Sequence, residues 1–484
     1  MNGEAEAQGC YNNYIIELMK QNRRDFIKLT GLAGLGIAGA GVAGCATRGQ
    51  DRSPFRQSHT QRFNMSGYAA PGLETVRIGL IGVGGRGFGA LRRHVRIEGV
   101  QITALSDIVP ERVDKGRDFV QEYGHNPAIY HGSEDEWKKL CERDDVDLVY
   151  ICTPWNLHTP QCVYAMENDK HAATEIPAAQ TMDECWQLVE TSERTRKHCM
   201  ILENVCYDFF EMMTLNMARE GFFGEIVHGE GAYIHQLIQS RFNKNRMWRT
   251  EENIDRNGNL YPMHGLGPIC QLMDINYGDR MDYLVSLSSQ DFMMGRRAEE
   301  LAAEDEFWKD YVGRDFRGNM NTSIIKTHKG RSIMIQHDTT SPRPYSRIHL
   351  ISGTEGIARK YPLPARVATS HHGWLNDDEF RELEQRFTPE ITRRVGDMAR
   401  QVGGHGGMDT LMDWRLVDCL RNGLPLDIDV YDAALWSATI PLSEWSVANR
   451  SRPVDVPDFT AGNWQTNTPG MDINLERGGN TKLV

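Results

Sequence analysis

The feature that most constrains the fold of this chain is a short apolar run followed directly by a glycine-rich loop. Residues 76–81 (VRIGLI) are apolar and β-branched, and Gly82, Gly84 and Gly87 follow with the spacing G-x-G-x-x-G. One glycine permits the tight turn, one lets a phosphate approach the backbone, and one allows a helix to pack closely on the strand. The helix that we expect over residues 88–95 would direct its N-terminus at an anionic phosphate group.

A second strand and an acidic residue extend this pattern. Residues 101–106 (QITALS) are expected to form a strand, and Asp107 follows directly, about 20 residues after Gly87. A carboxylate at this point accepts hydrogen bonds from the adenosine ribose and disfavours a 2′-phosphate, so the sequence predicts NAD rather than NADP. The alternative is that Asp107 caps a helix that begins near Pro110. The order of strand, glycine loop, helix, strand and Asp favours the cofactor.

Further strands continue the alternation of strand and helix. Residues 147–152 are almost continuously apolar, as expected for a buried parallel strand, and residues 171–175 and 198–202 are two more candidate strands. Ligands bind at the carboxyl ends of such strands. Four side chains at these ends are therefore expected to line the nicotinamide half of the site: Trp155, His158, Glu175 and Asn204.

Composition and charge exclude several classes of protein. With 25% charged and 40% hydrophobic residues, the chain is not disordered as a whole. Its 66 acidic and 54 basic residues give a net charge of −12, which argues against nucleic-acid binding driven by overall charge. The ten Cys form no CxxC pair and no Cys/His zinc spacing, so we expect no metal site. His371 and His372 have no second ligand pair in the sequence and are expected in a solvated loop.

The N-terminal residues have the pattern of an export signal. Arg23 and Arg24 precede a Gly/Ala-rich apolar stretch that ends at Cys45, and residues 1–44 are expected to be an extension followed by a signal that resembles a twin-arginine signal. The segment 42–45 (VAGC) resembles a lipobox, which predicts lipid attachment at Cys45. We therefore expect an exported periplasmic or cell-envelope lipoprotein, held to the membrane by lipid alone. The alternative is a buried N-terminal helix. Residues 45–72 are polar and are expected to form a tether.

The expected fold class is α/β, with two folded domains. Residues 73–207 should form a Rossmann dinucleotide-binding domain, and residues 208–484 a C-terminal α+β domain with a mostly antiparallel sheet. The second domain is indicated by an alternating run at residues 225–235, by a hairpin with its tight turn at Lys329-Gly330, and by a further strand at residues 346–352. A late helix over residues 428–449 is expected to pack back on the first domain.

Several longer motifs point to one family. They are Gly84–Gly87, Trp155–His158, Glu203–Tyr207, Gly231–His235, Met247–Thr250, Asn257–Gly265 and Gly404–Asp409. Together they resemble glycoside hydrolase family 109, the NAD-dependent α-N-acetylgalactosaminidases, within the glucose–fructose oxidoreductase and inositol dehydrogenase superfamily. Ordinary dehydrogenases of that superfamily usually carry Glu-Lys-Pro where this chain has Glu175-Ile176-Pro177. An obvious cationic acid/base is therefore missing, which argues against simple dehydrogenase chemistry.

The resemblance implies two sets of site residues around a tightly bound, recycled NAD. The cofactor set comprises Gly82, Gly84, Arg86, Gly87, Asp107, Trp155, Asn156, Leu157, His158, Glu175, Ile176 and Asn204. The substrate set comprises Tyr233, Arg249, Tyr261, Pro262, Met263, His264 and Tyr345.

The resemblance also implies a redox-assisted glycosidase. Hydride leaves sugar carbon C3, a base removes the C2 proton, the C1 aglycone is eliminated, water adds, and hydride returns to C3. We assign His264 to the C3 hydroxyl with Tyr261 beside it, and Tyr233 to the C2 proton, because their pKa values can be tuned for proton transfer. For residues 261–264 the alternative is a structural turn with a satisfied histidine.

Two other functions stay open from the sequence. One is an NAD-dependent oxidoreductase that acts on a sugar or polyol with net hydride transfer, and the other is a non-catalytic sugar-binding lipoprotein. The expected partner is a small molecule or glycan in each case, without nucleic acid. Homo-oligomers occur in the superfamily that the chain resembles.

Overall fold

The computed structural model describes residues 53–484. The predicted export signal, the lipidation site Cys45 and the first part of the predicted tether lie outside the described residues. Residues 239–251 form a separate unit, which carries α8 (Ile238–Arg241) and α9 (Trp248–Glu251) and is described by itself. Residues 53–238 and 252–484 form the main folded unit. Within residues 53–484, no helix is long and apolar enough to cross a membrane.

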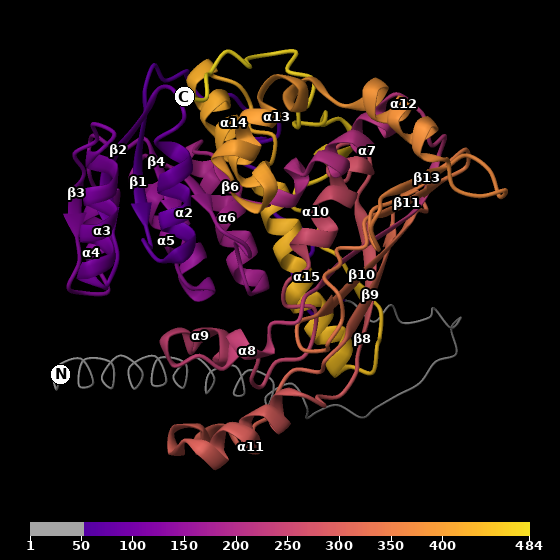
Figure 1. Ribbon diagram of the computed structural model, residues 1–484, viewed down its shortest axis with the longest axis horizontal. Coiled ribbons are helices and arrows are strands. Elements are labelled where there is room, and N and C mark those ends of the chain that lie inside the picture. Colours follow the sequence, from indigo (N-terminus) through magenta and orange to yellow (C-terminus); the bar gives the residue numbers. More distant parts are fainter. Residues whose placement is uncertain (1–52) are drawn as a thin grey trace, which may run out of the picture. The chain divides into compact units, whose positions relative to one another are not determined.

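The first part of the main unit is a parallel sheet with helices packed on it (Figure 1). Its strand order is β3-β2-β1-β4-β5-β6, and all neighbouring strands are parallel. The strands are β1 (Val76–Ile81), β2 (Val100–Ser106), β3 (Ala128–Tyr130), β4 (Leu148–Ile151), β5 (His171–Thr174) and β6 (Cys199–Ile201). The helices are α2 (Gly85–His94), α3 (Pro110–Gln121), α4 (Glu136–Cys141), α5 (His158–Glu167) and α6 (Met182–Thr195). The predicted Rossmann fold is confirmed.

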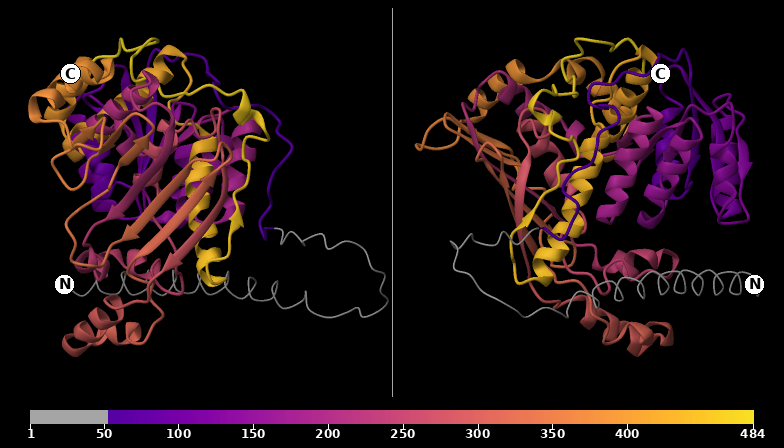
Figure 2. Two further views of the ribbon diagram at one scale, coloured as in Figure 1. Left: turned by 90° about the vertical axis from the view of Figure 1, so that its right-hand side faces the viewer. Right: turned by 180° about the vertical axis from the view of Figure 1, so that it is seen from behind.

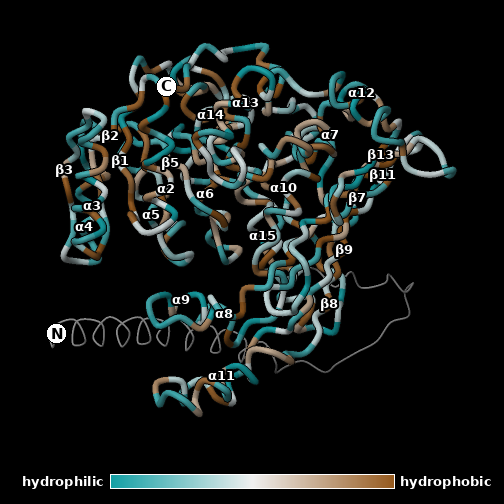
Figure 3. The backbone as a smooth tube through the Cα atoms, viewed as in Figure 1, coloured by the Kyte–Doolittle hydropathy of each residue, from teal (hydrophilic) through white to brown (hydrophobic). Residues whose placement is uncertain are grey.

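The apolar runs of the sequence explain this sheet. Every residue of β4 and β5 is buried, and β1 is buried at five of its six positions. Figure 3 shows the corresponding hydrophobic colouring along β1. Because helices cover both faces of a parallel sheet, its central strands are apolar throughout rather than alternating.

The second part is an eight-stranded sheet with the order β13-β12-β11-β7-β10-β9-β8-β14. The strands are β7 (Ile226–Ile234), β8 (Met281–Ser288), β9 (Asn321–Thr327), β10 (Ser332–Asp338), β11 (Leu350–Gly353), β12 (Ile357–Arg359), β13 (Arg366–Ala368) and β14 (Val454–Asp455). The pairing of β7 with β10 is parallel and the others are antiparallel, which confirms the mostly antiparallel prediction. Gly330, with φ +88°, turns the predicted hairpin between β9 and β10.

Seven further helices follow the parallel sheet in the chain. They are α7 (Phe209–Arg219), α10 (Met263–Leu272), α11 (Met294–Glu304), α12 (Asp377–Phe387), α13 (Glu390–Val402), α14 (Met408–Asn422) and α15 (Val430–Ala448). The predicted late helix is α15, which contacts α6 and β6 of the parallel sheet and β8 of the larger sheet. Figure 2 shows α15 in yellow beside both sheets. Its buried residues include Trp436 and Tyr431.

The described part of the predicted tether is a packed arm. Met65 and Ala70 are buried. The backbone N–H of Arg62 donates to Glu193 of α6 at 2.9 Å, and that of Met65 donates to the Tyr431 hydroxyl of α15 at 3.1 Å. For residues 53–72 the tether prediction is therefore wrong, because their scattered apolar residues and backbone groups find partners on the folded unit.

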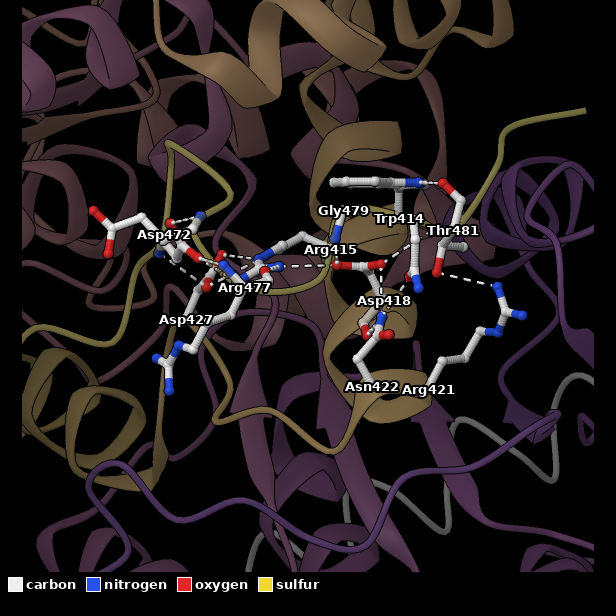
Figure 4. A network of polar contacts seen from close by, with 12 residues as sticks. Trp414, Arg415, Asp418, Arg421, Asn422, Asp427, Asp472, Arg477, Gly479 and Thr481 are labelled. Carbon is white, nitrogen blue, oxygen red and sulfur yellow. Dashed lines mark hydrogen bonds and ion pairs between the residues drawn. The ribbon is translucent and has the colours of Figure 1, made fainter.

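The C-terminal segment around Gly479 and Thr481 forms hydrogen bonds with α14 (Figure 4). Asp418 accepts hydrogen bonds from the backbone N–H of Gly479 at 2.7 Å and from Arg415 at 2.9 Å. The Trp414 indole donates to the Thr481 carbonyl at 2.9 Å. Because these polar groups are buried and paired, they hold α14 in one position.

Candidate active site

The glycine loop has the geometry that a dinucleotide requires. Gly82 has φ +89°, a backbone conformation that favours glycine. A Cβ on Gly87 would lie 1.9 Å from the Gly82 carbonyl oxygen, so only glycine lets α2 pack this closely. A Cβ on Gly84 would meet only an Arg112 nitrogen at 3.9 Å, so the loop is open there. The three positions therefore match the roles of turn, helix packing and backbone access to a pyrophosphate.

Asp107 lies at the carboxyl end of β2 and is tied to the glycine loop. Its carboxylate accepts hydrogen bonds from the backbone N–H of Val83 at 2.8 Å and of Val109 at 2.9 Å. Val109 is the N-cap residue of α3, so Asp107 is not the N-cap that the alternative interpretation requires. A carboxylate has capacity for further hydrogen bonds, so the arrangement fits a ribose.

A charged cluster lies at the carboxyl ends of the other strands. The Arg86 guanidinium donates to Glu175 at 2.5 Å and to Asp409 of α14 at 2.7 Å. Burial raises the pKa of Glu175, an effect that the charge of Arg86 offsets only in part. Burial alone would also raise the pKa of Asp409, but the hydrogen bond with His405 and the charges of Arg86 and Arg93 hold it well below its usual range. Asp409 is therefore ionised.

Asn204 joins the same cluster. Its side-chain amide donates to Asp409 at 2.5 Å, and its carbonyl oxygen Oδ1 is buried without a hydrogen-bond partner among residues 53–484. A buried unpaired acceptor costs free energy unless a ligand or water supplies a donor. The chemistry of this cluster therefore fits a cofactor that carries N–H donors, such as the carboxamide of NAD.

The motif at residues 155–158 lies between β4 and α5. Both ring nitrogens of the buried His158 lie close to backbone carbonyl oxygens, at 2.6 Å from Pro177 and 2.8 Å from Thr153. His158 thus links the loops that follow β4 and β5. Trp155 is buried, whereas Asn156 is exposed, and Ile176 is buried directly after Glu175.

The predicted substrate residues come together from separate elements. Tyr233 at the end of β7, Tyr261 in the loop before α10, and His264 in the first turn of α10 have ring centroids 5.0–5.2 Å apart. The Tyr261 ring also stacks on Trp155, with centroids 5.5 Å apart and planes 23° apart. The aromatic cluster of Tyr233, Tyr261 and His264 therefore lies directly beside the cofactor motif, and Pro262 and Met263, between Tyr261 and His264 in the chain, are buried.

A buried carboxylate orients His264. The Glu203 side chain is fully buried, and its Oε1 lies 2.8 Å from Nδ1 of His264. A carboxylate accepts, so Nδ1 carries the hydrogen and Nε2 of the neutral ring is left as the basic nitrogen. The backbone N–H of Val205 donates to the same Glu203 oxygen at 2.9 Å, which fixes the carboxylate.

Tyr345 borders the aromatic cluster beside a buried set of charges. Its ring lies 6.4 Å from that of Tyr233, and the Arg347 guanidinium carbon lies 5.9 Å from the Tyr345 ring centroid. Arg347 and Lys360 form ion pairs with Asp208 and Glu211. Burial would raise the pKa of Asp208, but the charges of Arg347 and Lys360 hold it well below its usual range.

The remaining predicted substrate residue belongs to the separate unit. Arg249 lies in α9, with its guanidinium carbon 4.2 Å from the ring centroid of Trp248. Because residues 239–251 form a separate unit, the assignment of Arg249 to the substrate stays a prediction.

Three residues of the site were not predicted: Glu203, Asp409 and His235, whose ring nitrogen lies 3.2 Å from the Tyr233 hydroxyl. Glu203 precedes Asn204 directly, and Asp409 ends the motif GHGGMD, so both lay within motifs that the sequence analysis singled out. Their partners are distant, since Asn204 and Asp409 are 205 positions apart. No local spacing could therefore have paired them.

Sequence comparison identifies both halves of the chain. Residues 76–203 match the oxidoreductase family with an NAD-binding Rossmann fold, and residues 207–466 match the C-terminal domain of glycosyl hydrolase 109. The chain belongs to glycosyl hydrolase family 109. A family 109 protein of Shewanella pealeana is 46% identical over 461 residues, covering 93% of this chain and 99% of the relative. An alpha-N-acetylgalactosaminidase of Bacteroides fragilis is 48% identical over 408 residues, covering 82% and 95%.

Solved structures confirm the fold of this family 109 chain. A levoglucosan dehydrogenase in complex with NADH covers 79% of this chain and 100% of its own, with a TM-score of 0.60 and 15% identity. A scyllo-inositol dehydrogenase of Lactobacillus casei with bound NAD(H) and scyllo-inositol gives a TM-score of 0.56 at 14% identity, covering 79% and 99%. The family 109 chain is thus a glycoside hydrolase built on an NAD-binding oxidoreductase fold.

Proposed function

We propose that this enzyme hydrolyses terminal α-N-acetylgalactosaminides through oxidation at sugar C3, with NAD retained and reused in every turnover. The observation that carries the proposal is the aromatic cluster beside Trp155, in a chain of a glycosidase family. Most glycosidases instead place two carboxylates across the scissile bond. Here the groups that border the cofactor motif are two tyrosines and a histidine.

The cofactor supplies one piece of chemistry: when bound, it offers a hydride acceptor for C3 and a hydride donor for the return step. The residues of the chain supply the proton transfers. His264, with its Nδ1 proton held by Glu203, takes the proton of the C3 hydroxyl at Nε2. We assign Tyr261, whose ring centroid lies 5.2 Å from that of His264, to stabilise negative charge on that oxygen through its hydroxyl.

After the C3 hydroxyl proton, the second proton to be removed from the sugar is the one on C2. Once C3 is a ketone, the C2 proton becomes acidic, and we assign its removal to Tyr233, whose hydroxyl lies 3.2 Å from Nδ1 of His235. His235 can accept the hydrogen of that hydroxyl, which favours its action as a base. Loss of the aglycone from C1 and addition of water to the unsaturated ketone complete the exchange before hydride returns to C3.

A product assay tests the proposal. The purified enzyme is incubated with p-nitrophenyl α-N-acetylgalactosaminide in deuterated water, and nitrophenol, absorbance at 340 nm and deuterium at C2 are followed together. We expect nitrophenol and C2-deuterated sugar without accumulation of NADH. Steady NADH production without nitrophenol would establish net oxidoreductase activity instead, and turnover by neither route would favour a sugar-binding role. The β-anomer serves as the control for anomeric specificity.

We further propose export and lipid anchoring, on the sequence of residues 22–45 alone. Replacing Cys45 with Ser should abolish incorporation of labelled fatty acid and release the protein from membranes. Replacing both Arg23 and Arg24 with Lys should retain the protein in the cytoplasm. Cytoplasmic, unmodified wild-type protein would contradict both parts.

A further inference from the structure

We propose that Asp409 is a positioning residue of the cofactor site, a single buried carboxylate from α14 that fixes Arg86 and Asn204 to hold the nicotinamide half of NAD. The inference rests on the proposed function, because it assumes that NAD is bound at this site during turnover. It goes further, because it names the group that organises the site and the half of the cofactor that depends on it.

Three segments far apart in the sequence meet at this carboxylate. Asp409 is 1% exposed and accepts hydrogen bonds from Arg86 at 2.7 Å and from the Asn204 amide at 2.5 Å. His405 lies 2.8 Å away, and Arg93 forms an ion pair at 3.6 Å. Arg86 begins α2 after the glycine loop, and Asn204 follows β6. Through Arg86 the cluster also includes Glu175 at the end of β5.

The charge of Asp409 determines which way the Asn204 side chain faces. An ionised carboxylate can only accept, so the amide nitrogen of Asn204 must point at it. The Asn204 Oδ1 is consequently turned away, buried, and without a partner among the described residues. An acceptor fixed in this way suits an N–H donor, such as the carboxamide of a nicotinamide, which the pyrophosphate does not provide. The adenine amino group is also a donor, so the position of the cluster must decide between the two halves of NAD.

The position of the cluster in the sheet indicates which half of NAD it serves. Asp107 ends β2, on one side of β1, whereas Glu175 and Asn204 follow β5 and β6 on the other side. In this fold the adenosine lies over the first side and the rest of the dinucleotide extends across the point where the strand order reverses. Loss of Asp409 should therefore affect nicotinamide binding more than adenosine binding.

Helix α14 holds Asp409 firmly. All five residues from Gly403 to Gly407 have positive φ, and the backbone N–H of Asp409 donates to the Gly404 carbonyl at 3.3 Å. A Cβ on Gly404 would lie 2.7 Å from the Cβ of Asp409, so the loop wraps closely around this residue. The network of Figure 4 fixes the other end of the helix.

The chain offers a matched control one turn along the same helix. Asp413 is also buried, and its hydrogen bonds go to Arg93 at 2.6 Å and to the Tyr150 hydroxyl at 2.8 Å rather than to Arg86 or Asn204. Asp409→Asn and Asp413→Asn both remove a buried charge from α14. Only the first disturbs residues that we assign to the cofactor.

The experiment compares NAD with ADP-ribose, which lacks the nicotinamide. Dissociation constants of both probes are measured by isothermal titration calorimetry on the full chain after bound nucleotide is removed. Asp409→Asn should weaken NAD binding by roughly 10- to 100-fold, because a hydrogen bond to a charged group is lost. The same substitution should weaken ADP-ribose binding much less. Asp413→Asn should leave the ratio of the two constants unchanged. An unchanged ratio in Asp409→Asn would overturn the proposal.

A double-variant cycle tests whether Asp409 acts through Asn204. Asn204→Ala should show the same selective loss of NAD, and adding Asp409→Asn should cost little more, because the two losses share one cause. Fully additive losses of NAD affinity would contradict the action of Asp409 through Asn204. If Asp409→Asn does not fold, Asn204→Ala alone still tests whether this side chain binds the nicotinamide half. Wild-type protein that binds NAD but shows no glycosidase activity would refute the proposed function without affecting this test.

Discussion

At the scale of single residues, the proposed proton transfers depend on which atom of each side chain can accept a proton. His264 is defined by its buried partner Glu203, which takes the Nδ1 proton and leaves Nε2 as the base. The motif at residues 257–265 marks His264 as a candidate base, but nothing in it indicates that Glu203 is its partner. The Tyr233 hydroxyl likewise depends on His235, two residues along the same strand.

Replacing Glu203 with Gln should lower kcat by roughly 10²-fold, because an amide can donate to Nδ1 and so favour the wrong tautomer of His264. KM should change little, since Glu203 is buried and cannot touch the substrate. The pH profile of kcat should also move. Glu252→Gln is the control, because Glu252 is a buried carboxylate paired with Arg256 at 2.6 Å outside the site. Equal losses in the two variants would indicate a merely structural role.

Replacing Tyr233 with Phe removes a hydroxyl and keeps the ring contacts. If Tyr233 removes the C2 proton, the variant should lose deuterium exchange at C2 by roughly 10²–10⁴-fold while C3 oxidation persists. NADH would then accumulate in the presence of substrate, which absorbance at 340 nm detects. Exchange at the wild-type rate would exclude Tyr233 as the base. Tyr345→Phe removes a hydroxyl at the border of the same cluster, from a side chain that is 39% exposed. Its rate of deuterium exchange at C2 is compared with that of Tyr233→Phe.

At the scale of elements, local patterns predicted most of the strands but missed the eight-residue β8 and several short strands. Strand β1 was predicted with its observed bounds and β7 to within one residue, and the turn at Lys329-Gly330 falls between β9 and β10 as expected. Strands β12 and β13, of three residues each, went unpredicted because so short a segment shows no period. The polar composition of residues 53–72 predicts a tether, because the contacts that pack this arm are with α6 and α15, far along the chain.

The glycine loop gives a pair of substitutions with opposite structural consequences. Gly87→Ala should prevent α2 from packing on β1, since its Cβ would lie 1.9 Å from a backbone oxygen, and the protein should lose thermal stability. Gly84→Ala should fold, because its Cβ meets only Arg112 at 3.9 Å. It should still bind NAD more weakly, because a methyl group would stand where the backbone meets the pyrophosphate. Melting temperatures and calorimetric NAD affinities separate the two effects, and wild-type affinity in Gly84→Ala would contradict this assignment.

At the scale of the whole molecule, buried acids of α15 couple its stability to pH. Burial raises the pKa of Asp429, at the N-terminus of α15, to about 6. Asp432, one turn along, is fully buried and accepts a hydrogen bond from Tyr277 at 2.6 Å. Because α15 contacts both sheets, its stability affects the whole main unit.

The sign of this pH dependence follows from the raised pKa. The folded state holds the Asp429 proton more tightly than the unfolded chain, so this contribution is fully present below about pH 4 and is lost as pH rises through about 6. Asp429→Asn should remove this contribution to the pH dependence, and the stability of the variant relative to wild type should rise by ~2 kcal/mol from pH 4 to pH 8. Urea denaturation across this range measures the difference. A difference that does not change with pH would contradict the role of Asp429.

The sequence by itself determined the NAD-binding Rossmann fold, the mostly antiparallel second sheet and the family, because each depends on local spacing or on motifs read along the chain. Only the tertiary structure placed Asp409 against Arg86 and Asn204, Glu203 against His264, and residues 53–72 on the folded unit. These pairings join segments from different elements, and their free energy comes from burial and charge that no local pattern encodes. The glycine loop could thus be recognised from its own residues, whereas the carboxylates that orient the site's Asn204, Arg86 and His264 could be recognised only once the chain had folded.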